Sequence, residues 1–116
     1  MEVVEASIDD IFIIQTLADQ IWPSTFSDIL SEEQITYMIN MMYSTASLNY
    51  QMAEAGHHFL LARDNDEYLG YVSYEFDYKE KGQTKIHKIY VLPSIQGKGI
   101  GKLFIDKISQ LATENE

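Results

Sequence analysis

The sequence of 116 residues contains no cysteine. The chain therefore cannot form a disulfide, bind a metal through thiolates or use a cysteine nucleophile, and we do not expect redox chemistry. Long apolar runs are also missing, because no stretch approaches the roughly 18 apolar residues that cross a bilayer. The first residues, Met1 to Glu5, lack the basic start of a secretory signal. These absences predict a soluble, cytoplasmic protein with no membrane partner.

Positive charge is scarce, since 8 Lys and Arg residues stand against 18 Asp and Glu residues, for a net charge of −10. Binding to duplex nucleic acid depends on basic residues that neutralise phosphates, so we expect no nucleic-acid partner. The charge is also uneven. Up to Glu75 the acidic residues are accompanied by Arg63 alone, whereas all seven lysines follow Phe76. This pattern is typical of solvated surface, or of an acidic substrate side and a basic cofactor side.

The patterning of the first half predicts helices. Ser7 is expected to cap the first helix, and Ser31 begins a capping box for the second. Pro23 is expected to end the first helix, because proline has no N–H to donate. The predicted elements are a strand at Val3 and Val4 and helices over 8–22, from the box at Ser31 to Met42, and over 47–55.

After Gly56 the apolar period changes from that of a helix to that of a strand. Residues 58–62 and 68–78 read as a hairpin around a polar turn, 85–91 as another strand, and the residues from Gly99 as a final helix. The predicted order is therefore βαααβββα. With 46% hydrophobic residues, the chain can bury one core, so we expect one α/β domain over residues 1–116.

The most informative segment is 89–102, where a strand leads through a glycine-rich turn into a helix. Glycines let the backbone approach a phosphate, and the unpaired N–H groups of a first helical turn attract anions. Lys98 and Lys102 add positive charge. The glycines alone are equally typical of an ordinary tight connection. Neither the G-x-x-x-x-G-K-[ST] pattern nor a complete G-x-G-x-x-G pattern is present.

The motif Gln96-x-x-Gly99-x-Gly101, after a Tyr-Val-x-Pro strand end, resembles the acetyl-CoA signature of the GNAT superfamily of N-acetyltransferases. Ile21–Phe26, Tyr37-Met38, Met42–Ser44 and Gly70-Tyr71 are similar to a bacterial subgroup of amine acetyltransferases. The resemblance implies the GNAT fold, a mixed and mostly antiparallel sheet flanked by helices. It also implies direct transfer of an acetyl group from acetyl-CoA to a primary amine in a ternary complex, without a metal ion.

The resemblance also implies which residues hold acetyl-CoA. The backbone of the strand end would hydrogen-bond the pantetheine arm, with the Val91 N–H near the thioester carbonyl, and the glycine-rich turn would wrap the pyrophosphate. The residues implied are Ile89, Tyr90, Val91, Gln96, Gly97, Lys98, Gly99, Ile100, Gly101 and Lys102. The acidic first half favours a cationic acceptor, either a small amine such as a polyamine or a protein amine.

Acetyl transfer also requires a group that accepts a proton from the amine. His87, Glu75 and Asp77 are the candidates, and many relatives carry a base on the strand of His87. Equally, His87 could be a satisfied strand histidine, and the two carboxylates could be solvent-facing hairpin residues. His57 and His58 have no metal-ligand spacing with a third group, so we expect no metal site.

The GNAT fold continues beyond its pyrophosphate-binding helix, whereas Glu116 follows that helix closely here. We therefore expect an incomplete domain with an open edge at the strand ending at Val91, completed by further sequence or by a partner chain such as a homodimer. Two other functions remain open. One is a non-catalytic module for acetyl-CoA binding or oligomerisation, and the other is a nucleotide-phosphate binder that uses the same turn.

Overall fold

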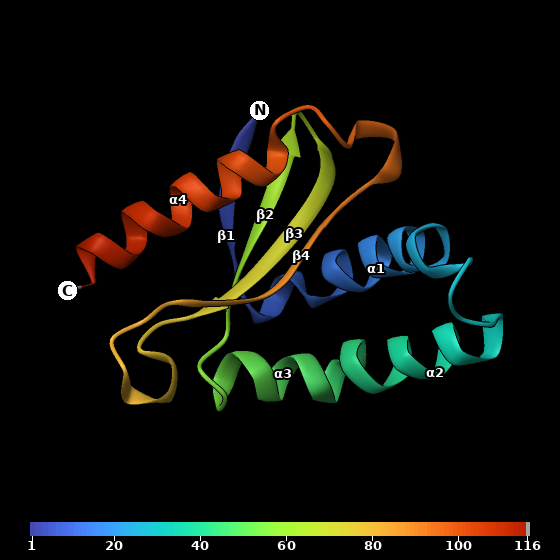
Figure 1. Cartoon of the computed structure of the whole chain (residues 1–116), viewed down its shortest axis with the longest axis horizontal. Coiled ribbons are helices and arrows are strands. Elements are labelled where there is room, and N and C mark those ends of the chain that lie inside the picture. Colours follow the sequence, from blue (N-terminus) through green and yellow to red (C-terminus); the bar gives the residue numbers. More distant parts are fainter. Residues whose placement is uncertain (116) are drawn as a thin grey trace.

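A computed structural model describes residues 1–115 and confirms the predicted order of elements (Figure 1). The strands and helices are β1 Glu2–Ala6, α1 Ile11–Phe26, α2 Glu32–Tyr43, α3 Thr45–Ala53, β2 His58–Asp64, β3 Glu67–Glu75, β4 Lys85–Val91 and α4 Ile100–Glu114. Short 3₁₀ turns occur at η1 Ile8–Asp10, η2 Tyr78–Glu80 and η3 Pro93–Ile95. Within the described residues, no helix is both long and apolar enough to cross a membrane.

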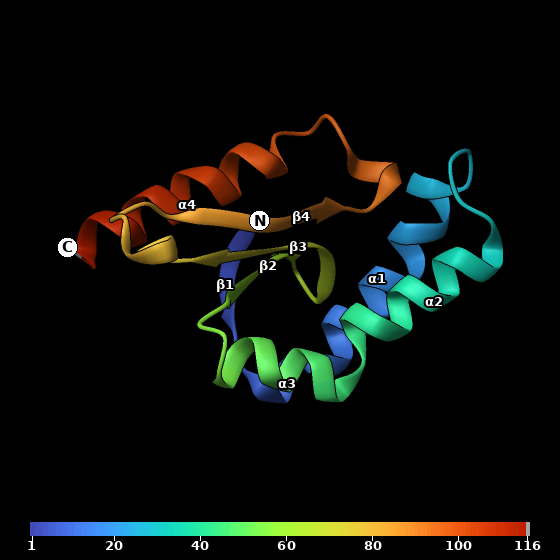
Figure 2. The ribbon, with the colours of Figure 1, turned by 60° about the horizontal axis from the view of Figure 1, so that its bottom comes forward.

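The four strands form one antiparallel sheet in the order β1-β2-β3-β4. Helix α4 covers one face of this sheet, and α1, α2 and α3 lie on the other face (Figures 1 and 2). Strand β4 pairs with β3 along one side only and is thus an edge strand of the described sheet. The domain has the expected α/β architecture with helices on both faces.

Each face of the sheet has its own core, because the strand residues alternate between the two sides. On the α1 side, Ile14, Ile21 and Leu48 are fully buried and pack against Leu61 and Tyr71. The core on the α4 side consists of Ile100, Phe104 and Ile108 from the helix with Leu60, Ala62, Leu69, Val72 and Tyr74 from the strands. The sheet is therefore packed on both faces, and its turn and edge regions are left to carry function.

The first helix differs from the prediction at both ends. Ser7 and Asp10 form the expected capping box, but it caps the 3₁₀ turn η1, and α1 begins only at Ile11. Pro23 does not end the helix, since it lies inside α1, which continues to Phe26. A proline removes only one helical hydrogen bond, and packing of the last turn compensates, with the Trp22 and Phe26 rings 4.5 Å apart.

Other predicted boundaries shift as well. Helix α3 begins at Thr45, two residues before the prediction, because the Ser44 hydroxyl accepts a hydrogen bond from the Ser47 N–H and caps the helix there. Strand β3 ends at Glu75 and does not reach Tyr78. The chain turns away because Asp77 and Lys79 adopt left-handed backbone conformations, with φ of 49° and 54°.

Candidate functional site

The turn between β4 and α4 is shaped by two glycines. Gly97 and Gly99 have φ of +83° and +82°, in the left-handed region that favours glycine, and Gly99 is the N-cap of α4. In the described residues no side chain caps this helix end, and its first turn carries no acidic residue. A Cβ atom added at Gly97, Gly99 or Gly101 would meet nothing within 4 Å. The N-terminus of α4 therefore opens onto free space.

The side chains around this turn play unequal parts. Lys102 forms an exposed ion pair with Asp106, at 2.9 Å, so its charge is partly neutralised, whereas Lys98 is exposed. The Gln96 side chain folds back and donates to the Val91 carbonyl at 3.4 Å, which ties the turn to the end of β4. Ile100 is buried in the α4 core, so only its backbone faces the turn.

The end of β4 presents a free backbone edge next to this turn. Among the described strands only β3 pairs with β4, so the other side of Ile89, Tyr90 and Val91 can receive an extended ligand. The Tyr90 ring anchors this segment by packing against the α1 side, 5.8 Å from the Trp22 ring. Gly70 lies opposite Val91, and a Cβ there would come within 2.6 Å of the Tyr90 carbonyl oxygen.

A cluster of three side chains occupies the other end of β4. His87 Nε2 lies 2.9 Å from Glu75 Oε1, a distance at which the ring N–H donates to the carboxylate. His57 Nε2 lies 3.6 Å from the same oxygen. The rings of His57 and His87 stack with centroids 4.0 Å apart and an interplanar angle of 14°. The structure thus brings the predicted pair Glu75 and His87 together and adds His57.

A β-bulge determines the direction of His87. The register shifts from Ser73 opposite Lys88 to Tyr74 opposite Ile86, which leaves His87 as the extra residue of β4. Ile86 packs on the α4 side, while Lys88 contacts Gln51 of α3. With the bulge between them, His87 and Lys88 can both reach the α3 side of the sheet. Simple alternation could not settle this orientation from sequence.

The cluster lies in a partly desolvated environment that includes a lysine. Burial lowers the pKa of Lys88, whose Nζ donates to Gln51 Oε1 at 2.9 Å and lies 5.8 Å from the centroid of the Phe59 ring. Burial, together with the neighbouring His87 and Lys88, lowers the pKa of His57 to about 4. His57 is therefore neutral at pH 7, and its buried Nδ1 has no hydrogen-bond partner within residues 1–115.

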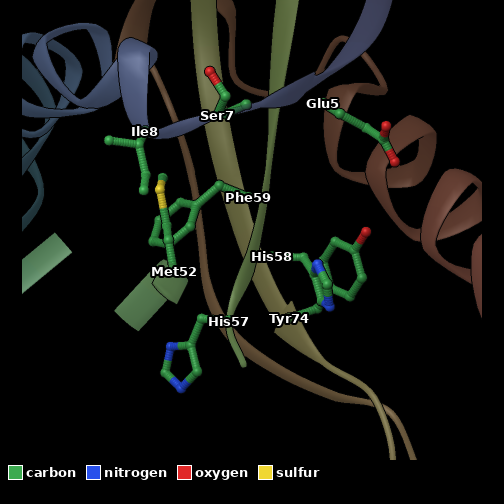
Figure 3. Close-up of a pocket in the computed structure, with 9 residues that line it drawn as sticks. Glu5, Ser7, Ile8, Met52, His57, His58, Phe59 and Tyr74 are labelled. Atoms are coloured by element: carbon green, nitrogen blue, oxygen red, sulfur yellow. The ribbon is translucent and has the colours of Figure 1, made fainter. Parts of the chain in front are cut away.

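The remaining candidates lie outside this cluster. Asp77 accepts a hydrogen bond from the Gly82 N–H at 2.7 Å and closes the hairpin turn. The side chain of His58, the first residue of β2, points in a different direction from that of His57 (Figure 3). It lies beside Tyr74 in a surface pocket, with the centroids of the two rings 5.3 Å apart. In the sequence His57 has no metal-ligand spacing with a third group, but the fold brings it together with Glu75 and His87. Sequence spacing could not reveal a contact that needs three separate segments.

Buried tyrosines form a structural network between the helices and the sheet. The Tyr71 hydroxyl donates to the Tyr43 hydroxyl at 2.7 Å, and the Trp22 indole N–H donates to the same oxygen at 3.3 Å. Burial raises the pKa of Tyr43 to about 12 and that of Tyr71 further above its ordinary value. Both groups therefore stay protonated at neutral pH and serve in packing and hydrogen bonding.

Comparison with known proteins adds family and fold. The family model described as "Acetyltransferase (GNAT) family" matches residues 14–116. The PaiA N-acetyltransferase from Thermoplasma acidophilum, solved in complex with coenzyme A, is 22% identical with a TM-score of 0.84, over 98% of this chain and 72% of that one. A GCN5-related N-acetyltransferase from Rhodopseudomonas palustris is 19% identical with a TM-score of 0.73, over 98% and 66%.

A third solved structure, a predicted acetyltransferase with acetyl-CoA from Clostridium acetobutylicum, is 19% identical with a TM-score of 0.68, over 98% of this chain and 74% of that one. At these identities the likeness shows the fold. The chain spans 72%, 66% and 74% of the lengths of these three proteins.

Proposed function

Because the chain belongs to the acetyltransferase (GNAT) family, we propose that it binds acetyl-CoA at the β4–α4 turn and transfers the acetyl group to a primary amine. The observation that carries the proposal is the N-terminus of α4, which begins at a left-handed Gly99 with open space in front of it. Backbone N–H groups at such a helix end bind phosphate oxygens without a side chain. The turn follows directly on the free edge of β4.

In this proposal two neighbouring backbone segments bind the pantetheine arm and the pyrophosphate of the cofactor. The pantetheine arm pairs with residues 89–91 as an added strand would, and the turn from Gln96 to Lys102 surrounds the pyrophosphate. A backbone N–H of this strand edge polarises the thioester carbonyl as negative charge develops on its oxygen. Tyr90 and Gln96 hold this backbone in place through the packing and the hydrogen bond described above.

We propose that His87 accepts the proton of the amine. When its Nε2–H donates to Glu75, a neutral His87 keeps its lone pair on Nδ1, where it can accept a proton from the amine. As the amine nitrogen bonds to the carbonyl carbon, the C–S bond breaks, the thiolate of CoA leaves, and the amine proton passes to His87. Glu75 orients the ring and stabilises the imidazolium that forms. The net charge of −10 favours a cationic amine, such as a polyamine or a protein amine.

The edge position of β4 supports a second candidate, in which this chain is a non-catalytic module that binds acetyl-CoA or self-associates. An edge strand presents unpaired backbone groups that can pair with another chain, so a homodimer could form there. Acetyl transfer separates the two candidates. Radiolabelled acetyl-CoA incubated with a panel of amines yields labelled product only if the chain is an enzyme.

The cofactor site is tested by titrating CoA into the wild type and two variants in a calorimeter. Gly99→Val should abolish CoA binding, because it places a side chain in the space that the pyrophosphate needs. Gly82→Val is the matched control. Gly82 also has a left-handed backbone, with φ of +70°, and open space around it, but it lies in the connection between β3 and β4. Circular dichroism checks that both variants fold.

Unchanged CoA affinity in Gly99→Val would refute the assigned site. Equal loss in Gly82→Val would show that backbone strain, rather than lost phosphate space, is responsible. ATP is included as a competitor. If ATP displaces bound CoA as effectively as added CoA does, the chain is better described as a general nucleotide-phosphate binder.

A further inference from the structure

Three side chains from separate segments place two imidazoles and a carboxylate around a common point. His57 precedes β2, Glu75 ends β3, and His87 lies in β4, and one ligand atom of each lies within 4.8 Å of the others. We propose that these three residues, the His57–Glu75–His87 cluster, form a binding site for a Zn²⁺ ion. Two histidines and one carboxylate, with a fourth position left for water, are a ligand set that Zn²⁺ accepts in proteins.

The spacing of the ligand atoms fits this ion. Bonds of about 2.0 to 2.2 Å in a tetrahedron place neighbouring ligand atoms about 3.3 Å apart. In the cluster, Glu75 Oε1 lies 2.9 Å from His87 Nε2 and 3.6 Å from His57 Nε2, on either side of that value. All three ligand atoms lie within 4.8 Å of one another.

One ring must turn for the ion to bind, because two parallel imidazoles cannot both direct a lone pair at the same point. The His57 and His87 rings stack with an interplanar angle of 14°. His57 is the ring that can turn, since its Nδ1 has no partner among the described residues and no hydrogen bond at that atom opposes rotation. Binding of the ion would therefore separate the two stacked rings.

One positive charge lies beside the cluster and opposes cation binding. Lys88 follows His87 directly, is partly buried, and pairs with the neutral Gln51 amide, with no carboxylate partner within residues 1–115. Its charge acts on the same space as the ion and must weaken cation binding. Removing that charge should strengthen the site.

Zn²⁺ would also change what His87 can do. With Nε2 bound to the ion, the remaining proton of a neutral His87 is on Nδ1, so the ring has no lone pair to accept a proton. Zn²⁺ would thus inhibit acetyl transfer without blocking CoA. This consequence rests on the proposed function, whereas binding of the ion does not.

Binding is measured on the full chain, freed of any purification histidines, by calorimetric titration with Zn²⁺ and by the visible absorption of Co²⁺ as a four-coordinate substitute. We expect one ion per chain in the wild type. His57→Gln, Glu75→Gln and His87→Gln should each weaken the affinity for Zn²⁺ by about 10-fold or more. His58→Gln is the matched control, because His58 is adjacent in sequence but faces Tyr74, and it should bind as the wild type does.

Lys88→Met tests the site from the opposite direction, since it keeps the buried stem, removes the charge and should tighten Zn²⁺ binding. Absence of binding, wild-type affinity in all three ligand variants, or no tightening in Lys88→Met would overturn the proposal. Should a ligand variant fail to fold, Lys88→Met and His58→Gln still decide the matter. CoA titrations of the same proteins keep this test separate, because the proposed cofactor site would remain intact if only the metal site were wrong.

Discussion

The two ends of β4 carry candidate functions built from different materials. The carboxyl end of β4 offers backbone groups, glycine conformations and a helix terminus, which depend on a few consecutive residues. The amino end of β4 offers side chains from three distant segments, which the sheet register and a bulge bring together. A site made of consecutive backbone can be recognised as a motif, whereas a site made of distant side chains requires the fold.

The sharpest test of this division is to remove the chemistry at one end and keep binding at the other. His87→Gln should lower kcat by about 10² to 10⁴-fold, the usual contribution of a positioned acid or base, while CoA affinity stays the same. Glu75→Gln should lower kcat less, because Glu75 acts through His87. Steady-state kinetics with a polyamine acceptor, beside CoA calorimetry, gives both numbers. A parallel fall in CoA affinity would show that the two ends are not separate.

Gly70→Val addresses the opposite end. Its Cβ would meet the Tyr90 carbonyl oxygen at 2.6 Å, so β4 must shift away from β3 next to the cofactor turn. Overpacking of this kind costs about 1 to 3 kcal/mol, measured as the free energy of unfolding in urea. We also expect weaker CoA binding. If the variant unfolds at the wild-type midpoint, the close approach of the two strands is wrong.

The acidic surface gives a third test, which separates steering of the acceptor from simple solvation. Thirteen of the acidic residues precede Phe76, and Arg63 is the only lysine or arginine in that part of the sequence. Raising the ionic strength so that the Debye length falls from about 30 to about 10 Å should raise the KM of a polycationic acceptor several-fold. The KM of acetyl-CoA should rise by a different factor, since it binds near lysines. An acceptor KM that does not change with salt would leave the acidic surface a solubility feature.

The smallest effect is expected at the exposed ion pair of the turn. Asp106→Asn releases Lys102 from its partner at 2.9 Å and should tighten CoA binding slightly, by less than about tenfold, because surface pairs contribute about 0 to 1 kcal/mol. Lys102→Met is the counterpart and should weaken binding by a similar factor. Calorimetry at low salt detects both changes. Identical affinities in the two variants would place Lys102 outside the cofactor site.

The turn could be predicted from sequence because each of its features is local. Gly99 at the start of α4 follows from glycine chemistry and apolar period, and the order of elements follows from the same patterns. His57 could not be predicted as a neighbour of Glu75, because only the sheet register and the turn after α3 bring them together. Pro23 misled for a related reason, since packing of Phe26 on Trp22 outweighs one lost hydrogen bond.

Trp22 is the only tryptophan of the sequence, and it is 3% exposed. Its ring lies 5.8 Å from that of Tyr90, whose backbone belongs to the proposed cofactor strand, and its indole N–H donates to Tyr43. The tryptophan emission of this protein therefore comes from one position beside the proposed ligand path. A shift in emission wavelength on adding CoA, absent in Gly99→Val, would give a label-free optical signal of cofactor binding, suited to stopped-flow mixing.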